Sequence, residues 1–482
     1  MENGGGTYRR TKIVATLGPA TAAAEVMEAM LRAGLDVARL NLSHGTHDSH
    51  RAQVAVARAA AERTGRCLAI MVDLQGPKIR IERFRDGEVF LRDRQRFTLD
   101  AELAPDAGDH TRVGITYKQL PQDVRPGDCL LLADGLIRLE VESVTGAAIH
   151  TRVMVGGRLT NSKGINRLGG GLSVGALTDK DRADIRFAAE IDADYVAVSF
   201  PKSAADIHEA RRLLQEAGSS AGIIAKIERR EALDALEEIM EAADAVMVAR
   251  GDLAVEIGDP QLAGVQKEIL RRARLHDCVV ITATQMMASM VHAPTPTRAE
   301  VLDVANAILD GTDAVMLSEE TAAGDHPARV VATMAEICTG TEHYQHFHRS
   351  RDDGRGYSRI DEAIAKASID TANRLQAKAI AALTESGATV MWMSRIGTRI
   401  PIFAFTRNPA TQRKVNLYQG VYPIAYDPVT PEPAVVNREV VQHLRQIGAV
   451  RDGDIVIITK GDLAGVPGGT NNMKIVRVGE TV

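Results

Sequence analysis

The sequence predicts an α/β protein: a (β/α)8 TIM barrel with an inserted β-barrel lid domain and a C-terminal α/β domain. Three observations lead to this prediction. Short apolar runs alternate with amphipathic stretches through much of the chain. The alternation is interrupted once, after the third run, by a segment rich in short β-type runs. A second α/β pattern follows a polar stretch late in the chain.

Eight apolar runs of strand length account for the barrel. They are Lys12–Thr16, Val37–Leu42, Ala69–Asp73, Tyr195–Ser199, Ile223–Ile227, Ala245–Ala249, Val279–Thr282 and Ala314–Leu317. Helical patterns separate most of them, for example Ala204–Ala217 and the segment that opens with the capping box Thr297–Glu300. Continuous apolar strands that alternate with helices are typical of a covered parallel sheet, and eight such units predict a closed barrel.

The interruption runs from Gly76-Pro77 to Gly169–Gly171 and contains β-type runs such as Leu130–Leu132. Glycine and proline at its junctions suit a hinge, so we expect a lid over the barrel mouth; a rigid appendage is the alternative. The polar stretch His346–Arg355 is expected to be a linker. The predicted parts are a flexible tail (1–6), the barrel (7–76 and 173–347), the lid (77–172) and the C-terminal domain (348–482). The last contains the apolar runs Val390–Met393, Ile402–Phe405 and Ile455–Ile458.

Composition excludes several classes of protein. The net charge of −5 and the single tryptophan among 482 residues argue against nucleic-acid binding. No apolar stretch reaches the ~18 residues of a membrane span, and Met1–Gly6 lacks the apolar region of a signal peptide. The four cysteines lie far apart, which argues against a zinc site and a disulfide framework. We therefore expect a cytoplasmic protein.

Charged residues close two of the apolar runs. Side chains alternate along a strand, so Lys226 and Glu228 point to the same face. The next run ends in Arg250-Gly251-Asp252. Burying such charges is costly unless they bind something, so two acids and two bases at two strand ends predict a site for a metal ion and an anionic substrate. A pair of internal salt bridges is the alternative.

Polar residues collect at the ends of nearly all the predicted strands, where the active sites of (β/α)8 barrels lie. They are Asn41 and Ser43, Asp73, Ser199, Lys226 and Glu228, Arg250 and Asp252, Thr282 and Thr284, and Ser318 and Glu320.

Six motifs, in this order, closely resemble those of pyruvate kinases. They are Thr11–Ala20, Ala38–Gly45, Ala225–Glu228, Ala249–Leu253, Ala283–Met286 and Asp310–Ser318. The resemblance extends from about residue 7 to the C-terminus. It implies the same barrel, an inserted β lid and a C-terminal regulatory domain. It also implies phosphoryl transfer from phosphoenolpyruvate to ADP, giving pyruvate and ATP, a reaction that asks mainly for positioning and charge neutralisation.

The resemblance assigns roles to the charged residues. Glu228 and Asp252 would hold a divalent ion, Mg2+ or alternatively Mn2+, which prefers one or two carboxylates plus substrate oxygens. Lys226 and Arg39 would contact the transferring phosphoryl group. The backbone of Arg250 and Gly251, joined by Thr284, would hold the substrate carboxylate, and we expect the glycine because the corner is tight.

The enolate must also receive a proton, and the nucleotide must be bound. The resemblance offers Thr284 and Ser318, with Glu320 behind, as the proton source, acting through water; simple hydrogen bonding in a barrel mouth is the alternative. For the nucleotide it points to Thr16, Pro19, Asn41, His44, Arg80 and Lys163. A polar cap is the alternative for His44, and a solvated lysine for Lys163.

The sequence departs from the family pattern near the monovalent-cation site. Many pyruvate kinases hold potassium with the positions that match Asn41, Ser43, Asp73 and the carbonyl of Leu74, and nearby they carry Gly-Pro-Glu-Ile-Arg. Here Lys78 replaces that acid, in Gly76–Arg80. An ammonium group carries the charge of a potassium ion, so Lys78 could take the place of that ion permanently, and we expect activity without potassium. A surface lysine with potassium still bound is the alternative.

The C-terminal domain carries a possible effector loop. Thr384–Thr389 matches the loop that binds effector phosphate in allosteric relatives, and its hydroxyls and amides, with Thr384, Ser386, Gly387 and Thr389, could form an anion nest. Gly465–Asn472 would be a second part. Glu385 stands where some bisphosphate-activated members carry lysine, so we expect a monophosphate such as a sugar phosphate or AMP. The resemblance further implies a homotetramer; an unliganded turn is the alternative for the loop.

Two other functions compete with the kinase. Aldolases or lyases acting on pyruvate also use barrels with paired acids, but they need neither a nucleotide lid nor an effector domain. A metabolite sensor would have lost a charged site residue, and none is missing. Only the kinase would make ATP from phosphoenolpyruvate, ADP and Mg2+.

Overall fold

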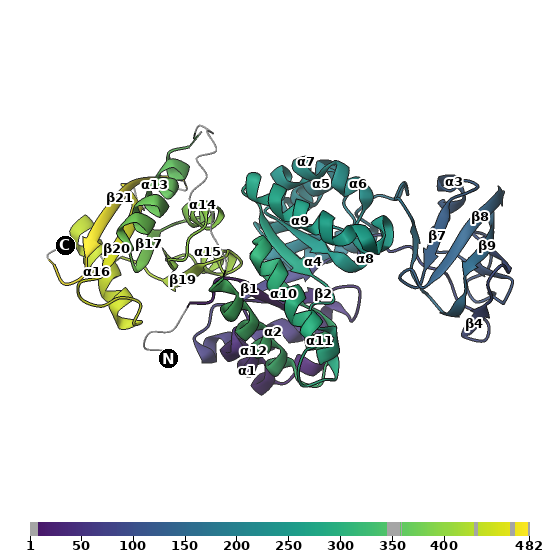
Figure 1. Cartoon of the computed structure of the whole chain (residues 1–482), viewed down its shortest axis with the longest axis horizontal. Helices are drawn as coiled ribbons and strands as arrows, with labels where there is room; N and C mark the ends of the chain where they lie inside the picture. The colour runs from purple at the N-terminus through teal and green to yellow at the C-terminus, as the bar shows by residue number, and fades with distance from the viewer. Residues whose placement is uncertain (1–7, 345–356, 358, 429–431, 463–467, 481–482) are drawn as a thin grey trace.

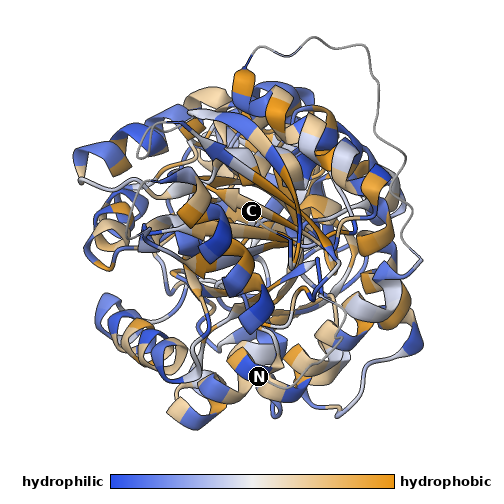
Figure 2. Cartoon of the chain, turned by 90° about the vertical axis from the view of Figure 1, so that its left-hand side faces the viewer, coloured by the Kyte–Doolittle hydropathy of each residue, from blue (hydrophilic) through white to orange (hydrophobic). Residues whose placement is uncertain are grey.

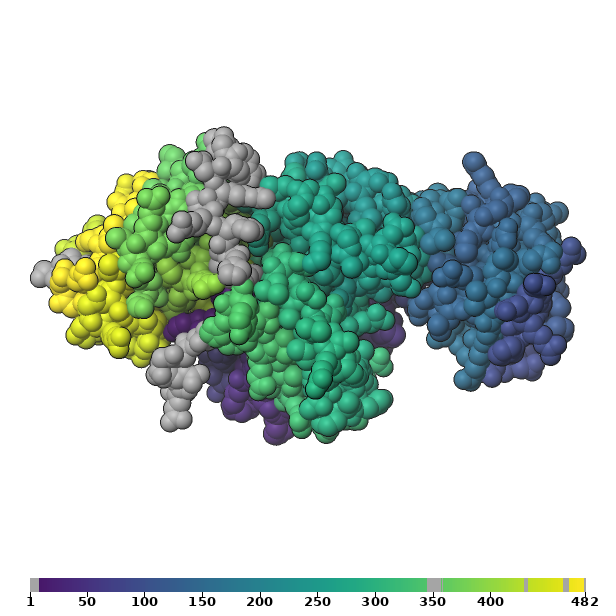
Figure 3. Space-filling model, in the orientation of Figure 1, coloured from purple at the N-terminus to yellow at the C-terminus, as the bar shows by residue number. Residues whose placement is uncertain are grey.

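A computed structural model describes residues 8–344, 357, 359–428, 432–462 and 468–480. The predicted tail 1–6, the linker His346–Arg355 and part of the second effector loop lie outside these residues. Figure 1 shows three bodies in a row, with the barrel between the C-terminal domain and the lid. The lid stands at one end of the molecule (Figure 3).

Eight parallel strands form a closed barrel, as predicted, and their order around it is β1-β16-β15-β14-β13-β12-β3-β2. They are β1 (Lys12–Thr16), β2 (Val37–Asn41), β3 (Ala69–Asp73), β12 (Tyr195–Val198), β13 (Gly222–Ile227), β14 (Ala245–Ala249), β15 (Val279–Ala283) and β16 (Ala314–Leu317). Each predicted strand is confirmed to within one or two residues.

Helices surround the barrel. They are α1 (Ala24–Ala33), α2 (His47–Thr64), α4 (Asp179–Glu190), α5 (Ala204–Glu216), α6 (Arg230–Asp234), α7 (Leu236–Ala242), α8 (Arg250–Ile257), α9 (Asp259–Leu275), α10 (Arg298–Asp310), α11 (Glu319–Ala322) and α12 (Pro327–Glu342). The predicted capping box starts α10, where Thr297 N–H donates to Glu300 Oε2 at 2.7 Å. Two short 3-10 turns, Pro19–Thr21 and Ala288–Val291, follow β1 and β15.

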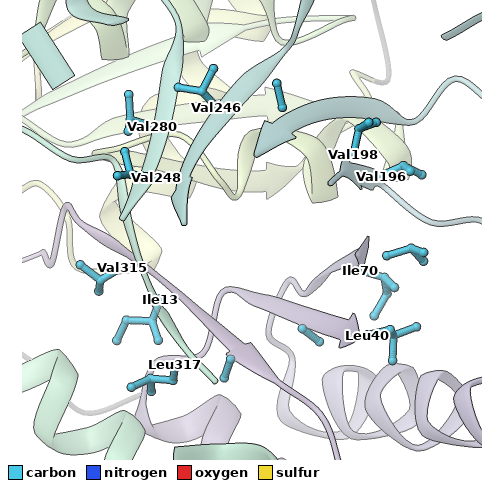
Figure 4. Close-up of a cluster of buried hydrophobic side chains, with 14 of the residues drawn as sticks. Ile13, Leu40, Ile70, Val196, Val198, Val246, Val248, Val280, Val315 and Leu317 are labelled. Atoms are coloured by element: carbon cyan, nitrogen blue, oxygen red, sulfur yellow. The ribbon is translucent and has the colours of Figure 1, made fainter. Parts of the chain in front are cut away.

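Alternation along the strands divides the barrel into two apolar layers. Residues of one parity, such as Ile13, Leu40 and Val246, pack outward against the helices (Figure 4). Residues of the other parity, such as Val14 and Met247, fill the interior. The interior layer belongs to the same buried cluster as one face of the C-terminal sheet, with residues such as Ile380 and Ile457, whereas the other face of that sheet packs in a separate cluster with residues such as Phe403 and Val456.

The inserted segment forms a six-stranded sheet in the order β11-β7-β8-β9-β5-β6 and a separate pair β10-β4. The elements are β4 (Glu88–Leu91), β5 (Arg96–Asp100), β6 (Arg112–Gly114), α3 (Leu120–Asp123), β7 (Cys129–Leu132), β8 (Ile137–Thr145), β9 (Ala148–Val155), β10 (Gly157–Thr160) and β11 (Ile165–Arg167). Isolated bridges pair Arg80 with Gly164, beside β11, and Ile81 with Ile115, beside β6. The segment that leaves the barrel therefore joins both edges of the sheet and completes a barrel-like β domain with its own core.

The C-terminal domain is a five-stranded sheet in the order β19-β18-β17-β20-β21, in which only β21 is antiparallel. Its elements are α13 (Ile360–Leu375), β17 (Ala379–Leu383), α14 (Ala388–Ile396), β18 (Ile402–Thr406), α15 (Pro409–Val415), β19 (Val421–Ala425), α16 (Pro433–Gln446), β20 (Ile455–Gly461) and β21 (Thr470–Arg477). The apolar run Val390–Met393 lies in α14, whereas the other two predicted runs form β18 and β20. Figure 2 views the molecule from this domain, with hydrophobic strands surrounded by helices.

Four aspartates attach the bottom of the barrel to its surroundings. One aspartate stands directly before every second barrel strand, and its carboxylate accepts a backbone N–H from the preceding barrel strand in the chain at 2.8–2.9 Å. The pairs are Asp36 with Ile13, Asp194 with Ile70, Asp244 with Ile223 and Asp313 with Val280. Each aspartate also contacts a basic side chain, respectively Arg9, Arg413, Lys414 and Arg395. Because Arg413 and Lys414 lie on α15, this repeated contact fixes the C-terminal domain to the strand ends.

Among the described residues, none of the helices is both long enough and apolar enough to cross a membrane.

Candidate active site

The alternation that fills the barrel interior also places polar side chains at its mouth. Met71 and Asp73 share a face of β3, as do Ile224, Lys226 and Glu228 on and after β13. The apolar members of each face are buried in the interior layer. The charged members at the carboxyl ends of these parallel strands therefore meet above that layer.

Lys226 lies at the centre of the site. Its Nζ is 2.8 Å from Glu228 Oε1 and 3.3 Å from Asp73 Oδ1, and it donates to Ser199 Oγ at 2.7 Å. Burial alone lowers its pKa, but the carboxylates of Asp73 and Glu228 raise the pKa above the ordinary lysine value. Lys226 is therefore a fixed positive charge.

Asp73 joins Lys226 to Arg39. Its Oδ2 accepts from Arg39 Nε at 2.7 Å, and Arg39 Nη1 donates to Thr16 Oγ1 at 2.8 Å. Burial opposes ionisation of Asp73, yet Lys226 and Arg39 hold the pKa of this carboxyl below its usual value. One anion thus fixes two cations side by side, and two adjacent cations can bind an anionic group such as a phosphoryl group.

Glu228 and Asp252 are the two candidate metal ligands. Glu228 is 1% exposed and accepts the N–H of Phe200 at 2.8 Å. Burial, and then repulsion from Asp252, raise the pKa of Glu228 to about 7 against the attraction of Lys226. Within the described ranges no three His, Cys, Asp or Glu side chains cluster as metal ligands. Two repelling carboxylates fit a Mg2+-type ion, which needs only one or two from the protein.

Thr284 lies beside Gly251. The Gly251 N–H donates to Thr284 Oγ1 at 2.9 Å, and that hydroxyl donates to the Ala283 carbonyl at 2.7 Å. The expectation that Gly251 occupies a tight corner is wrong as far as protein atoms are concerned. A Cβ on Gly251 would meet only Thr284 Oγ1, at 3.8 Å. The left-handed residues of this corner are Thr284 (φ 67°) and Gln285 (φ 54°).

Glu320 lies behind Ser318 and is 2% exposed. Its carboxylate accepts the N–H of Ser318 at 2.6 Å and the N–H of Met287 at 3.3 Å. Glu320 therefore ties the loop after β16 to the loop after β15, and its contacts are with backbone rather than with the Ser318 hydroxyl.

The residues predicted for the nucleotide differ in exposure. Thr16 is buried, with its hydroxyl donating to the Leu317 carbonyl at 2.9 Å. Pro19 and His44 are exposed around the mouth, and Lys163 is exposed on the lid. Arg80 donates to the Ser162 carbonyl at 2.9 Å, so it lies in the lid beside Lys163.

The structure separates Lys78 from the other residues of the predicted cation region. Its Nζ lies 3.7 Å from Asp252 Oδ1, on the metal side of the site. The Leu74 carbonyl accepts from Ser199 Oγ at 2.7 Å, and Asn41 Oδ1 accepts the Ser43 N–H at 3.2 Å. Asp73 contacts Lys226 rather than Lys78.

The predicted effector loop lines a cavity of about 210 Å³ in the C-terminal domain. Gly387 N–H donates to Thr384 Oγ1 at 3.0 Å, and Thr389 Oγ1 pairs with Thr470 Oγ1 at 2.7 Å. Arg407, which also lines the cavity, lies 2.8 Å from Glu385. Other lining residues include Ser386, Lys460 and Gly468–Thr470.

Sequence reasoning missed two contributors. Ser199 was noted only as a polar strand end, but it contacts Lys226 directly. Asp303 contacts Arg250 from α10, where a charged residue within a helical pattern gives no signal of such a contact.

Comparisons with known proteins identify the family of the chain. Residues 8–331 match the family model "Pyruvate kinase, barrel domain", and residues 362–476 match "Pyruvate kinase, alpha/beta domain". The chain is 50% identical over 475 residues to pyruvate kinase II of Salmonella typhimurium, covering 98% of this chain and 99% of that protein.

Two further relatives agree. A pyruvate kinase of Haemophilus influenzae is 50% identical over 458 residues, 94% of this chain and 96% of its own. A pyruvate kinase of Mycobacterium intracellulare is 40% identical over 479 residues, which cover 98% of this chain and 99% of that protein. The chain therefore belongs to the pyruvate kinase family, divalent-metal-dependent enzymes that transfer the phosphoryl group of phosphoenolpyruvate to ADP and release pyruvate and ATP.

Proposed function

We propose that Lys226 and Arg39 bind the transferring phosphoryl group, and that Glu228 and Asp252 hold Mg2+, with Mn2+ as an alternative. The observation that carries this proposal is the arrangement of Lys226 between Asp73, Glu228 and Ser199. The bound ion would neutralise charge on the phosphoryl and enolate oxygens. Arg39 and Lys226 orient the phosphoryl group because Asp73 fixes both cations.

At the other end of the substrate, the backbone N–H groups of Arg250 and Gly251 and the Thr284 hydroxyl hold the carboxylate. The carboxylate then replaces the acceptors that two of these donors have in the free site, Thr284 Oγ1 for the Gly251 N–H and the Ala283 carbonyl for the Thr284 hydroxyl. The enolate is protonated on carbon from the side of Thr284 and Ser318, through an ordered water. Because Glu320 accepts two backbone N–H groups, its role is to hold these loops, and it does not donate the proton directly.

The nucleotide is bound between the mouth and the lid. The barrel side chains that contact the nucleotide are Pro19, His44 and Asn41. Thr16 acts indirectly, because its hydroxyl accepts a hydrogen bond from Arg39. Arg80 and Lys163 contribute from the lid, and lid closure brings them to the nucleotide phosphates.

A coupled assay with phosphoenolpyruvate, ADP and Mg2+ tests these roles. Lys226→Met should lower kcat by about a hundredfold to a thousandfold, because it removes the charge that faces the phosphoryl group. Lys267→Met is the control: Lys267 is an exposed lysine that pairs with Asp310 at 2.6 Å. Retained activity in Lys226→Met, or equal losses in both variants, would refute the assignment.

We also propose that activity does not require potassium. The proposal rests on two positive charges that the protein itself supplies. Lys78 adds a cation beside the metal ligand Asp252, and Lys226 already lies beside Asp73. Assays in tetramethylammonium buffer, with and without potassium chloride, test this. Equal rates are expected, and activation of many-fold by potassium would refute it. In Lys78→Glu, potassium should become an activator.

The cavity beside Thr384, Ser386, Gly387 and Thr389 is proposed to bind the phosphate of a monophosphate effector. Glu385 lines this cavity and, although it pairs with Arg407, it places a carboxylate where a second phosphate would lie, and this acid opposes the second phosphate. Activity should be titrated with glucose 6-phosphate, ribose 5-phosphate, AMP and fructose 1,6-bisphosphate. Dominant activation by the last would overturn the proposal.

The remaining proposals concern the whole molecule. A cytoplasmic homotetramer would let an effector bound in one domain alter contacts between subunits. Light scattering at micromolar concentration tests the assembly, and a monomer of 51.9 kDa would contradict it.

A further inference from the structure

We propose that Asp303 and the guanidinium of Arg250 form a positioning pair that holds Thr284 in the geometry that receives the substrate carboxylate. The inference rests on the proposed function, in which the Gly251 N–H and the Thr284 hydroxyl meet that carboxylate. It assigns a role to the Arg250 side chain, beyond its backbone, and to Asp303.

The Arg250 side chain reaches across the site to the loop after β15. Its Nε donates to the carbonyls of Ala283 and Thr284 at 3.2 and 3.1 Å, and its Nη2 donates to the Thr284 carbonyl at 2.5 Å. The next residue, Gly251, donates its N–H to the Thr284 hydroxyl. Two consecutive residues of α8 therefore hold both the backbone and the side chain of Thr284.

This support matters because the loop is strained. Thr284 and Gln285 both have positive φ, although neither is glycine, and threonine is β-branched. Such conformations cost free energy and persist only where the surroundings fix them. Three hydrogen bonds from one buried guanidinium to the adjacent carbonyls provide that fixation.

Asp303 holds the guanidinium in place. Arg250 Nη1 donates to both Asp303 oxygens, at 2.8 and 2.7 Å, and the Arg250 side chain is only 8% exposed. Without Asp303, a nearly buried cation would lose its contacting carboxylate and would be drawn toward solvent. Its hydrogen bonds to the loop would then weaken, and the Thr284 hydroxyl would move away from the Gly251 N–H.

A purely structural ion pair between α10 and α8 is the competing explanation, and kinetics separate the two. In Asp303→Asn the KM for phosphoenolpyruvate should rise about tenfold, which is the loss expected for a weakened charge-assisted hydrogen bond. The KM for ADP should stay within about twofold of the wild-type value. The conservative variant Asp303→Glu should restore most of the affinity.

The matched control is Asp310→Asn, which removes another carboxylate of α10, one that pairs with Lys267. It should leave both KM values unchanged. If Asp303→Asn leaves the KM for phosphoenolpyruvate unchanged, or raises both KM values together with a lower thermal midpoint, the positioning role is refuted. Arg250→Lys, which cannot make all of these hydrogen bonds, should reproduce the selective KM increase.

Thr284→Val separates failure of this inference from failure of the proposed function. It removes the hydroxyl but keeps the β-branched shape. A raised KM for phosphoenolpyruvate in Thr284→Val, with none in Asp303→Asn, refutes only the positioning pair. An unchanged KM in Thr284→Val refutes the proposed contact between the Thr284 hydroxyl and the substrate carboxylate.

Discussion

Lys12 donates a hydrogen bond of 2.6 Å from its ammonium group to the carbonyl of Val421. Lys12 begins the first barrel strand and Val421 begins β19, so this bond joins the catalytic barrel to the C-terminal domain. Lys12 is only 2% exposed, and its ammonium also lies 4.9 Å from the centre of the Tyr422 ring. A nearly buried cation here has consequences for stability.

The first prediction concerns alkaline pH. Burial lowers the pKa of Lys12 to about 8, below the 10.5 of an unfolded lysine. Between these values the unfolded chain binds more protons, so the free energy of unfolding should rise with pH. The gain should total roughly 3 kcal/mol by pH 10.5, because each pKa unit is worth about 1.4 kcal/mol. Below pH 8 the full cost of the buried charge is present.

Lys12→Met should lack this pH-dependent gain. Urea unfolding followed by the fluorescence of Trp392, the single tryptophan, at pH 7.5 and 9.5 measures it. Lys267→Met, at an exposed site, serves as the control. Parallel changes in wild type and Lys12→Met would contradict the prediction.

The second prediction concerns Glu228, which we propose as a metal ligand. Its pKa is raised to about 7, mainly by burial, so a proton competes with the metal below pH 7. Apparent affinity for Mg2+ should fall about tenfold per pH unit below that value and level off above it. Calorimetric titration at pH 6 and 8 measures this change.

The matched control is Glu256, on the same helix as Asp252, whose pKa burial also raises to about 7. Its carboxylate accepts the Arg230 N–H at 3.0 Å. Glu256→Gln should keep the pH dependence of metal affinity, whereas Glu228→Gln should abolish strong binding. The opposite pattern would show that the wrong carboxylate had been assigned.

The third prediction concerns the attachment of the C-terminal domain through Arg413. Asp194 accepts both the Ile70 N–H and the Arg413 Nε, and its side chain is 3% exposed. Asp194→Asn should destabilise the protein by about 2–4 kcal/mol, because it removes the buried carboxylate and leaves the partly buried cation with only the exposed carboxylate of Asp192. Urea unfolding measures the loss.

Arg413 offers its own control. Its Nη2 also pairs with Asp192 at 2.6 Å, but that carboxylate is 70% exposed. Asp192→Asn should therefore cost no more than about 0.5 kcal/mol. Equal losses in the two variants would show that burial does not govern this contact.

The fourth prediction concerns effector choice. Glu385→Lys removes the acid that pairs with Arg407 and places a second cation at the cavity. The concentration of fructose 1,6-bisphosphate needed for half-maximal activation should fall at least about tenfold, because the pair of cations can bind a second phosphate. Asp452→Lys, at an exposed pair with Arg445 in the same domain, is the control. Unchanged selectivity would contradict the prediction.

Much of the fold follows from the sequence because its cause is local. Buried parallel strands require continuous apolar runs, so the sequence alone predicts Ala245–Ala249 and the other barrel strands. The same period of two that buries Met71 also directs Asp73 into the mouth, so the charged ends of the strands predicted where a site would form.

Contacts between distant segments were not predictable in this way. Asp194 and Asp303 look like ordinary solvated acids in the sequence, because their partners Arg413 and Arg250 lie far along the chain. Likewise, the sequence identified Lys78 as an extra cation near the site, but only the folded lid directs it to Asp252.

By itself, then, the sequence determined the barrel, its insertion and the chemical groups at its mouth, because strand periodicity and residue type are properties of short segments. The tertiary structure decided which of those groups touch: Asp73 between Arg39 and Lys226, and Arg250 against a left-handed Thr284. Those pairings depend on how separate strands and helices pack, and no short segment of sequence specifies that packing.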